Sequence, residues 1–410
     1  MSVPTDGTGV DSRDAQTAGS VVWVLFQPLD VVTFRDGRSF TAGTTASART
    51  TLPRPTSTGG ALTAVFGDRP DRIAGPVLAS VDPDGARLVL PVPADLVVDR
   101  DGLPHRLHPD MPVDLPAGVA VSCDLDASGV GATFRLLGGG GKPAPGALGG
   151  DAVAGYLRGE PERALAAVAA AEPAALVRER RLGLARHSRG AADGRGRTAV
   201  TGFLYVGEFW RARADAEARL GFACRVWFDR AAPTPVARIV RLGGEGRQAR
   251  VRVLPDATVD PPAGQAGPSS AVGTGVAVGD GTSGGRSPAL AVPDRPDGFP
   301  GGQVLLYLAT PAVFPDGWLP AGIDGADLVA ACTAGPEAVA GWAPDPDGPP
   351  GGGRPRPVRW AVGAGSVYFL RFGDEDAARV FARRFHGRCL PQAQDWLRTV
   401  GFGMCLVGVW

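Results

Sequence analysis

The sequence predicts an α+β protein built from two βαββαβ units, each enlarged by insertions. Short apolar segments of strand length alternate with amphipathic segments of helix length along most of the chain. A glycine-rich turn precedes a final apolar segment twice, as GGEGR before residues 248–254 and as GFG before residues 404–410. With 410 residues the chain is too long for one ordinary core, so two domains are expected.

The first domain is predicted over residues 21–255. Its elements, in chain order, are a strand over 21–34, a helix over 55–67, a strand over 88–98, a helical segment over 150–159, and strands over 203–210, 223–228 and, after the glycine turn, up to residue 254. The opening segment is rich in valine and aromatic residues, which favours a strand. The helix begins with Thr56, Ser57 and Thr58, and one of these hydroxyls is expected to cap its start.

The second domain is predicted over residues 299–410. Its elements are a strand over 304–314, a short helix over 326–335, a hairpin of VRWAVG and SVYFLRF, a helix over 374–387 and a terminal strand. The last helix has acidic residues at its start and arginines near its end, as the helix dipole favours. The order βαββαβ is that of a ferredoxin-like domain.

Two segments are predicted to lie outside the domains. Residues 256–298 are dense in Gly, Pro, Ala and Ser and have no periodic apolar face, so they are expected to form a flexible linker. Residues 1–20 are polar and are expected to be a disordered tail without the features of a signal peptide. No apolar run approaches the roughly 18 residues that cross a bilayer, so a cytoplasmic protein without membrane contact is expected.

Composition limits the classes of function. The chain has 42 basic and 42 acidic residues, so a nucleic-acid site would have to be a local patch. Its 5 cysteines form no Cys-x-x-Cys pair, which argues against a zinc knuckle or a disulfide framework. His105 and His108 lie in a proline-rich segment without further ligands, so no metal or other cofactor is expected.

Eight segments resemble one protein family in their order along the chain. They are PLDVVTFRDGRSF, LPRPTSTGGAL, LVLPVPADLV, GFLYVGEFWR, LGGEGR, YLATPAVFPDGWLP, GAGSVYFLRF and GFGMCLVGVW. The chain thereby resembles the RAMP superfamily of RNA-binding CRISPR proteins, and within it the third-subunit family of the Cmr (type III-B) effector complex. The resemblance implies two ferredoxin-like RAMP domains with a glycine-rich loop before a terminal strand.

The resemblance also implies a function without catalysis. Such a subunit holds the 5′ tag of the CRISPR RNA and docks on the large polymerase-cyclase-like subunit and on the backbone RAMP subunit. Some RAMP relatives cleave precursor RNA, so a metal-independent endoribonuclease that uses His187 as general base is the alternative. A protein-interaction module without RNA is a third, more distant possibility.

Four groups of residues are predicted to contact RNA. Arginines and glycines supply cations and free backbone N–H groups for phosphates, a mobile basic loop suits a single strand, and a glycine-flanked aromatic suits base stacking. The groups are Arg35 and Arg38 after the first strand; Gly243, Gly244, Gly246 and Arg247 in the first glycine loop; Arg186, His187 and Arg189 in the basic segment 178–197; and Gly401, Phe402 and Gly403. For each group an ordinary turn, a solvated charged loop or a core position remains the alternative.

Overall fold

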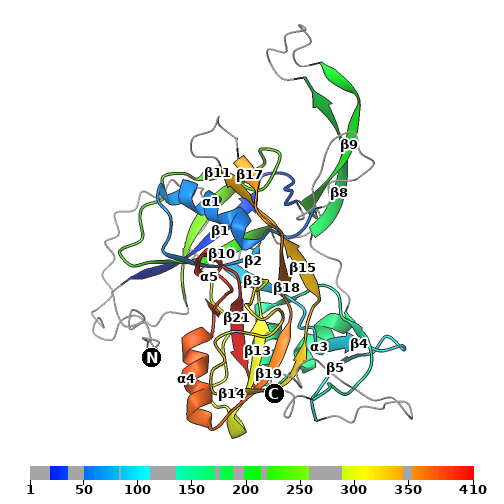
Figure 1. Ribbon diagram of the computed structural model, residues 1–410, viewed down its shortest axis with the longest axis vertical. Helices are drawn as coiled ribbons and strands as arrows, with labels where there is room; N and C mark the ends of the chain where they lie inside the picture. The colour runs from blue at the N-terminus through cyan, green and yellow to red at the C-terminus, as the bar shows by residue number, and fades with distance from the viewer. Residues whose placement is uncertain are drawn as a thin grey trace, which may run out of the picture.

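The computed structural model describes residues 19–35, 50–82, 85–110, 135–170, 176–187, 198–213, 219–257, 289–344 and 353–410. In this part of the chain, two large antiparallel sheets form the body and a long two-stranded arm projects from it (Figure 1). The predicted α+β class is confirmed. Residues 1–18 of the predicted tail lie outside the described residues.

The first sheet has the order β11-β12-β1-β10-β2-β3-β7. Its strands and its helix are β1 (Ser20–Pro28), α1 (Pro55–Phe66), β2 (Arg72–Asp82), β3 (Gly85–Pro91), β7 (Ala147–Gly149), β10 (Arg219–Phe228), β11 (Ile239–Arg241) and β12 (Gln248–Pro255). Four neighbours, β12, β1, β10 and β2, correspond to the fourth, first, third and second strands of a βαββαβ chain. This is the strand order of a ferredoxin-like sheet.

The second sheet, ordered β14-β19-β13-β21-β20, repeats this arrangement. It is formed by β13 (Gln303–Leu308), β14 (Ala326–Cys332), β19 (Val367–Phe372), β20 (Arg388–Cys389) and β21 (Met404–Gly408), with η3 (Pro300–Gly302), α4 (Glu375–Phe385) and α5 (Asp395–Val400) around it. Both glycine loops therefore precede a strand that pairs with the first strand of its own sheet: β12 with β1, and β21 with β13.

The two sheets differ in which of their strand connections contains the longest helix. In the first, α1 connects the first and second strands; in the second, α4 connects the third and fourth. Helix α4 is capped as expected, because the Asp374 side chain accepts a hydrogen bond of 2.8 Å from the Ala377 N–H. Helix α1 is not, because its cap residue is Arg54 and the Thr58 hydroxyl donates to the Pro55 carbonyl. The predicted hydroxyl cap of α1 is wrong.

Two further predictions in the second domain are wrong. Residues 326–332 form strand β14, not a helix, because the strand pairs with β19 along its length and this pairing overrides the helix propensity of alanine. The predicted hairpin is not formed either. β18 (Arg359–Val362) pairs with β15 (Pro336–Val339), whereas β19 lies between β13 and β14. The intervening segment crosses between sheets, with the Gly365 N–H bound to the Leu308 carbonyl.

The other elements are insertions and small sheets. They are β4 (Leu96–Val98), β5 (Pro104–Arg106), β6 (Lys142–Pro143), α2 (Gly150–Leu157), α3 (Glu162–Ala169), the arm strands β8 (Leu176–Arg186) and β9 (Ala199–Ala212), β16 (Trp342–Pro344) and β17 (Gly353–Pro355). One strand was predicted over residues 88–98. The structure instead divides this segment between β3 and β4, which belong to different sheets. In the described part of the chain, helices are too short or too polar to cross a membrane.

The two large sheets share one hydrophobic core. Trp23 and Leu25 of the first sheet and Tyr307 and Phe369 of the second belong to the same buried cluster, each with none of its surface exposed. Burial of these side chains stabilises the contact between the sheets, at about 1.5 to 3 kcal/mol for a side chain of this kind. The two units are therefore packed against each other over much of their length.

The ends of the predicted linker belong to the fold. Asp256 pairs with Arg225, with Nε and Oδ2 2.6 Å apart and side chains only 8% and 1% exposed for Arg225 and Asp256. Leu290 and Val292 are buried in the shared core. The predicted linker, residues 256–298, is therefore too long at both ends. Both ends carry buried side chains, and the glycine-rich composition of the segment gave no sign of them. Residues 258–288 lie outside the described residues.

Candidate nucleic-acid interface

The first glycine loop is a tight turn that closes on itself. The Leu242 N–H donates to the Arg247 carbonyl at 2.9 Å, and the Arg247 N–H donates to the Gly244 carbonyl at 3.3 Å. Gly243 and Gly246 have φ of 76° and 67°. A Cβ at Gly243 would lie 2.3 Å from the Thr33 carbonyl oxygen, so this position requires glycine for both its dihedral angle and its close approach.

Gly244 has a different role from the predicted one. Its φ is not in the positive region, and its N–H donates to the Thr33 carbonyl at 2.8 Å. This N–H is therefore committed to holding the loop against the chain that follows β1. The expectation that Gly244 offers a free N–H to a phosphate is wrong, because the close packing of the loop on Thr33 consumes that donor.

A groove lies beside the loop, between it, α1 and β11. We call it the glycine-loop groove; its cavity has a volume of about 690 Å³, within the range of small-ligand sites. It is lined by Phe34, Arg35, Ser57, Gly60, Ala61, Ala64, Ala237, Ile239, Val240, Arg241, Gly243 and Gly244. Three residues of the predicted site, Arg35, Gly243 and Gly244, thus come together in one hollow.

The sequence prediction missed Ser57, Gly60 and Arg241. A Cβ at Gly59 or Gly60 would have no neighbour within 4 Å, so the two glycines leave open space on the exposed side of α1. Adjacent glycines inside a helix cost stability and usually mark a close approach. The pair of adjacent glycines could have been recognised in the sequence. The position of Arg241 could not, because it depends on the pairing of β11 with β12.

Arg35 stands at the rim of the groove and is half exposed. Its Nη2 is 3.7 Å from Oε1 of Glu245, and its backbone forms a bridge with Thr50. Arg35 therefore lies next to the glycine loop, although the two come from distant parts of the sequence. Arg38 lies outside the described residues.

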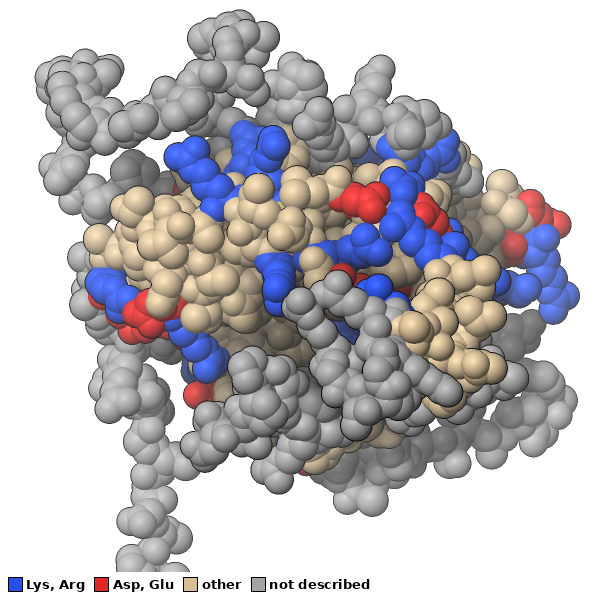
Figure 2. Space-filling view, turned by 90° about the horizontal axis from the view of Figure 1, so that it is seen from above, with Lys and Arg blue, Asp and Glu red and all other residues tan. Residues whose placement is uncertain are grey.

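A second cluster of charges adjoins the loop at the base of the arm. We call it the arginine–carboxylate cluster. It consists of Asp30, Glu179, Arg181, Arg211 and Arg247, with Phe209 beneath. It brings together the end of β1, both arm strands and the glycine loop. On the side of the molecule from which the arm rises, basic side chains gather among acidic ones (Figure 2).

Arg247 is held from two sides. Its Nη1 is 3.6 Å from Oδ2 of Asp30, and its guanidinium carbon lies 5.0 Å from the centre of the Phe209 ring. Its Nε is buried and has no hydrogen-bond partner among the described atoms. The Arg247 side chain is 29% exposed, so its guanidinium is held in place while part of it stays accessible to an anionic ligand.

Electrostatic coupling within the cluster is strong. Hydrogen bonds from Arg211 and Arg181 lower the pKa of Glu179 to about 2. The same contact with Glu179 raises the pKa of Arg211. Glu179 is therefore ionised at every physiological pH, and the arginines stay close to it.

The described part of the basic segment is not the predicted mobile loop: residues 178–186 lie in strand β8, and residues 188–197 lie outside the described residues. Leu176–Arg186 pairs with Ala199–Ala212 to form the arm seen in Figure 1. Arg186 is exposed near the far end of β8, and the adjacent His187 N–H donates to the Thr198 carbonyl at 3.0 Å. The sequence of β8, LVRERRLGLAR, has four consecutive charged residues and no apolar–polar alternation, so its strand pairing with β9 could not be recognised from a period of two. Arg189 lies outside the described residues.

The second glycine loop is not on the surface. Phe402 is 0% exposed and packs in a core cluster with Val313 and Leu397. The predicted stacking of Phe402 on a base is wrong, because its ring fills a core position. Gly401 has a φ of 115°, and a Cβ there would lie 2.3 Å from the Gly75 carbonyl of the first sheet. Gly403 has a φ of 73° and is buried against Gln392, so this loop is buried where the two units meet.

Histidines and carboxylates do not gather into a metal site in the described ranges, where no group of three or more His, Cys, Asp or Glu is placed to hold an ion. His108 packs its ring against Phe369 and Trp410. Burial lowers the pKa of His108, as expected for an imidazole with aromatic neighbours.

Comparison with known proteins supports one family. A family model described as "CRISPR-associated protein (Cas_Cmr3)" matches residues 24–271 and 299–410. Similar solved structures include a chain of "Cryo-EM structure of the Type III-B Cmr-beta bound to cognate target RNA", with 12% identity, a TM-score of 0.43 and coverage of 93% of this chain and 95% of that chain. A chain of the same assembly with "cognate target RNA and AMPPnP, state 1" has 14% identity, a TM-score of 0.37 and coverage of 85% and 86%.

No curated protein matches the sequence. The family match nevertheless spans both large sheets and both glycine loops, and it leaves out only residues 1–23 and 272–298. The resemblance inferred from the eight ordered segments is confirmed by this match. The chain belongs to the Cas_Cmr3 family of CRISPR-associated proteins.

Proposed function

We propose that this chain is a non-catalytic RNA-binding subunit of a type III-B Cmr effector complex, and that it holds the 5′ tag of the CRISPR RNA. The observation that carries the proposal is the glycine-loop groove, where Arg35 and the loop meet beside Arg247. Membership in the Cas_Cmr3 family supports the assignment to the complex. We further propose that the two four-strand sets are two ferredoxin-like RAMP domains.

The groove offers different chemistry at its rim and on its floor. Arg35 and Arg241 stand at the rim and supply cations for phosphate oxygens. The floor is apolar: Ala61 and Ala64 of α1 face Ile239 of β11, which is 52% exposed. A base would lie on this floor while the neighbouring phosphates reach the arginines. Sequence-tolerant contacts of this kind are common for single-stranded nucleic acid.

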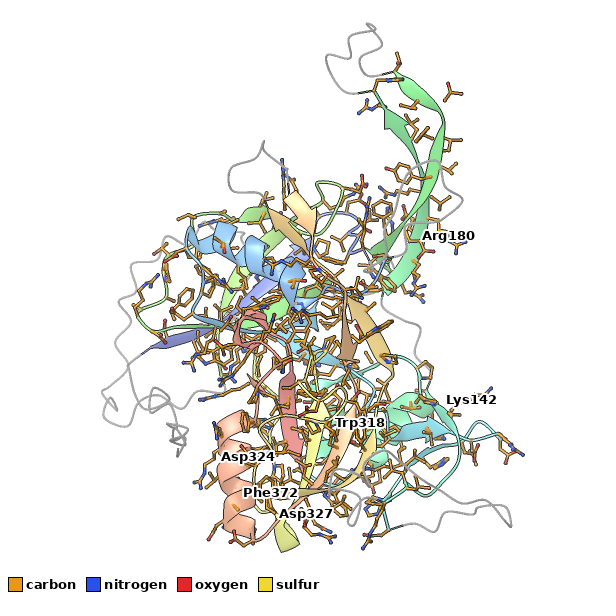
Figure 3. All side chains as sticks on the ribbon, viewed as in Figure 1. Lys142, Arg180, Trp318, Asp324, Asp327 and Phe372 are labelled. Atoms are coloured by element: carbon orange, nitrogen blue, oxygen red, sulfur yellow. The ribbon has the colours of Figure 1, made fainter. Side chains whose placement is uncertain are left out.

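Two exposed apolar surfaces support docking to two protein partners, for which we propose the large cyclase-like subunit and the backbone RAMP subunit. The first is on the arm, where Leu182 is 79% and Leu204 is 66% exposed. The second is a hollow of about 480 Å³ lined by Trp318 and by Trp360, which is 69% exposed. Figure 3 shows Arg180 on the arm, far from Trp318 in the body. Exposed apolar surfaces of this size commonly mark protein interfaces.

The RNA site is tested by changing the rim arginines together. Arg35→Ala with Arg241→Ala, in the complex reconstituted on a guide RNA, is expected to weaken guide binding about tenfold or more, because charge-assisted contacts contribute about 1.5 to 3 kcal/mol each. Arg379→Ala with Arg230→Ala is the matched control, since both arginines form surface ion pairs elsewhere. Equal guide affinity in the two double variants would remove the groove from the RNA site.

The absence of catalysis is tested separately. The full-length protein is incubated with precursor CRISPR RNA in EDTA, and intact RNA is the expected result. Specific cleavage that disappears in His187→Ala would instead establish the endoribonuclease alternative, with His187 as general base.

A further inference from the structure

We infer that Asp30 and Glu179 compete with RNA phosphates for the arginines of the cluster and so weaken sequence-independent RNA binding. In the RNA-free protein their carboxylates occupy three arginines, and an incoming phosphate chain must displace them. This inference rests on the proposed RNA-binding function and adds a reason for the cluster to contain acids as well as bases. It follows from contacts at the base of the arm.

Arg181 and Arg211 each contact both carboxylates, and Arg247 contacts that of Asp30. Asp30 Oδ2 is 3.4 Å from Arg181 Nη2 and 3.6 Å from Arg247 Nη1, and Asp30 Oδ1 is 3.2 Å from Arg211 Nη2. Glu179 accepts from the Nε of Arg181 and from the Nε of Arg211. The carboxylate oxygens thus occupy positions that phosphate oxygens would take in an arginine-rich RNA site.

The aromatic ring keeps two arginines in place when their partners change. Arg181 and Arg247 lie 5.5 Å and 5.0 Å from the centre of Phe209, which is 6% exposed. A cation over an aromatic face is attracted whether or not a carboxylate is present. The guanidinium groups therefore remain positioned for phosphate after the carboxylates are displaced.

Exposure makes the displacement feasible. The side chains of Asp30 and Glu179 are 46% and 29% exposed, so an incoming phosphate can reach the ion pairs that they form. Three arginines against two carboxylates leave the cluster with one net positive charge. An arbitrary RNA exchanges one set of ion pairs for another and gains little, whereas an RNA that also fills the glycine-loop groove gains further contacts. The carboxylates therefore lower the affinity of every RNA by a similar factor, and only an RNA with the further contacts still binds tightly.

The structural alternative is that the carboxylates only fasten the arm to the body. Asp30 follows β1 and contacts Arg181 and Arg211 on the arm, so such a role is geometrically possible. The two roles predict opposite effects on RNA binding. Loss of a fastener loosens the arm and weakens binding of every RNA, whereas loss of a repulsive element strengthens binding of unrelated RNA.

The test uses the full-length chain with Asp30→Asn and Glu179→Gln combined. Affinity is measured across salt concentrations for a tag-bearing RNA and for an RNA of equal length and shuffled sequence. We expect the double variant to bind the shuffled RNA about tenfold more tightly, with a log–log salt slope steeper by up to about 1.4, because two repulsive charges are gone. Affinity for the tag-bearing RNA should rise by a similar factor, because both RNAs have to displace the same carboxylates.

The matched control is Asp68→Asn combined with Glu160→Gln, which changes net charge equally but at surface ion pairs elsewhere. Equal slopes and equal RNA affinities in the two double variants would overturn the inference. Weaker binding of both RNAs, together with a lower melting temperature, would establish the fastening role instead. If the wild-type chain binds neither RNA and Arg247→Ala changes nothing, the proposed function itself fails, and the inference with it.

Discussion

Replacing Gly401 by alanine tests whether the second glycine loop serves folding or RNA. Alanine at a φ of 115° is strained, which costs about 1 to 3 kcal/mol. Its Cβ would also lie 2.3 Å from the Gly75 carbonyl oxygen, so backbone has to move, and overpacking of this kind costs about 1 to 3 kcal/mol more. The expected loss of unfolding free energy is therefore about 2 to 6 kcal/mol.

The assay is thermal unfolding followed by RNA binding. Unfolding entropy near 2.1 cal/mol/K per residue gives about 0.9 kcal/mol/K for this chain, so the melting temperature should fall by about 2 to 7 °C. Affinity of the folded fraction for guide RNA should stay unchanged. Gly373→Ala is the matched control, since a Cβ there meets nothing within 4 Å. An unaltered melting temperature with reduced RNA affinity would return Gly401 to the RNA site and refute the reasoning.

Four other changes probe the molecule outside the second glycine loop. Arg247→Ala should weaken guide RNA binding by about 1.5 to 3 kcal/mol without lowering the melting temperature, as measured by filter binding and thermal unfolding. Asp256→Ala should lower the free energy of unfolding, measured with denaturant, by about 3 to 5 kcal/mol, because it leaves Arg225 buried without its carboxylate partner. Replacing residues 259–287 by a short Gly/Ser linker should lower it by about 1 kcal/mol or less. His386 has a pKa lowered to about 4 by burial, so it folds as the neutral form. Its unfolded form gains a proton first, so stability should be full above pH 6.5 and decline as pH falls toward 4; a His386→Gln protein with an equally steep decline would contradict this.

The elements predicted correctly from the sequence are those whose pattern is local. Helix α4 has acids at one end, arginines at the other and an apolar face, and β21 is a continuous apolar segment after glycines. Each pattern lies within about a dozen consecutive residues, so contacts with distant segments do not change the element that it predicts. The equivalence of the two glycine loops was also correct, because each loop precedes the strand that pairs with the first strand of its sheet.

The predictions that failed depended on distant partners. The alanine-rich segment 326–332 has good helix propensity and becomes a strand only because β19 lies beside it. Phe402 between two glycines suggests an exposed loop in sequence, but Gly401 meets Gly75 of the other sheet and the aromatic ring is buried. No property of residues 401–403 alone distinguishes these environments.

Only part of the candidate site was predicted, because the rest depends on contacts between distant segments of the chain. Arg35 and Arg247 could be selected as cations near glycine turns, and the structure does place both beside the first glycine loop. Asp30, Glu179 and Phe209 were not selected, because they meet those arginines only after the arm folds back onto the end of β1. Position along the chain gave no sign of this meeting.

The place of β21 in the second sheet has a consequence for biosynthesis. This strand lies between β13 and β20, and its side chains are buried on both faces of the sheet. During synthesis the ribosome delivers β13 and β19 well before β21, so the second sheet stays open along β13 until the last strand arrives. The core shared by the two sheets includes Met404 and Leu406 of this strand, so it too stays incomplete until then. A nascent chain in that state exposes apolar surface, and its yield should depend on chaperones that bind such surfaces during elongation.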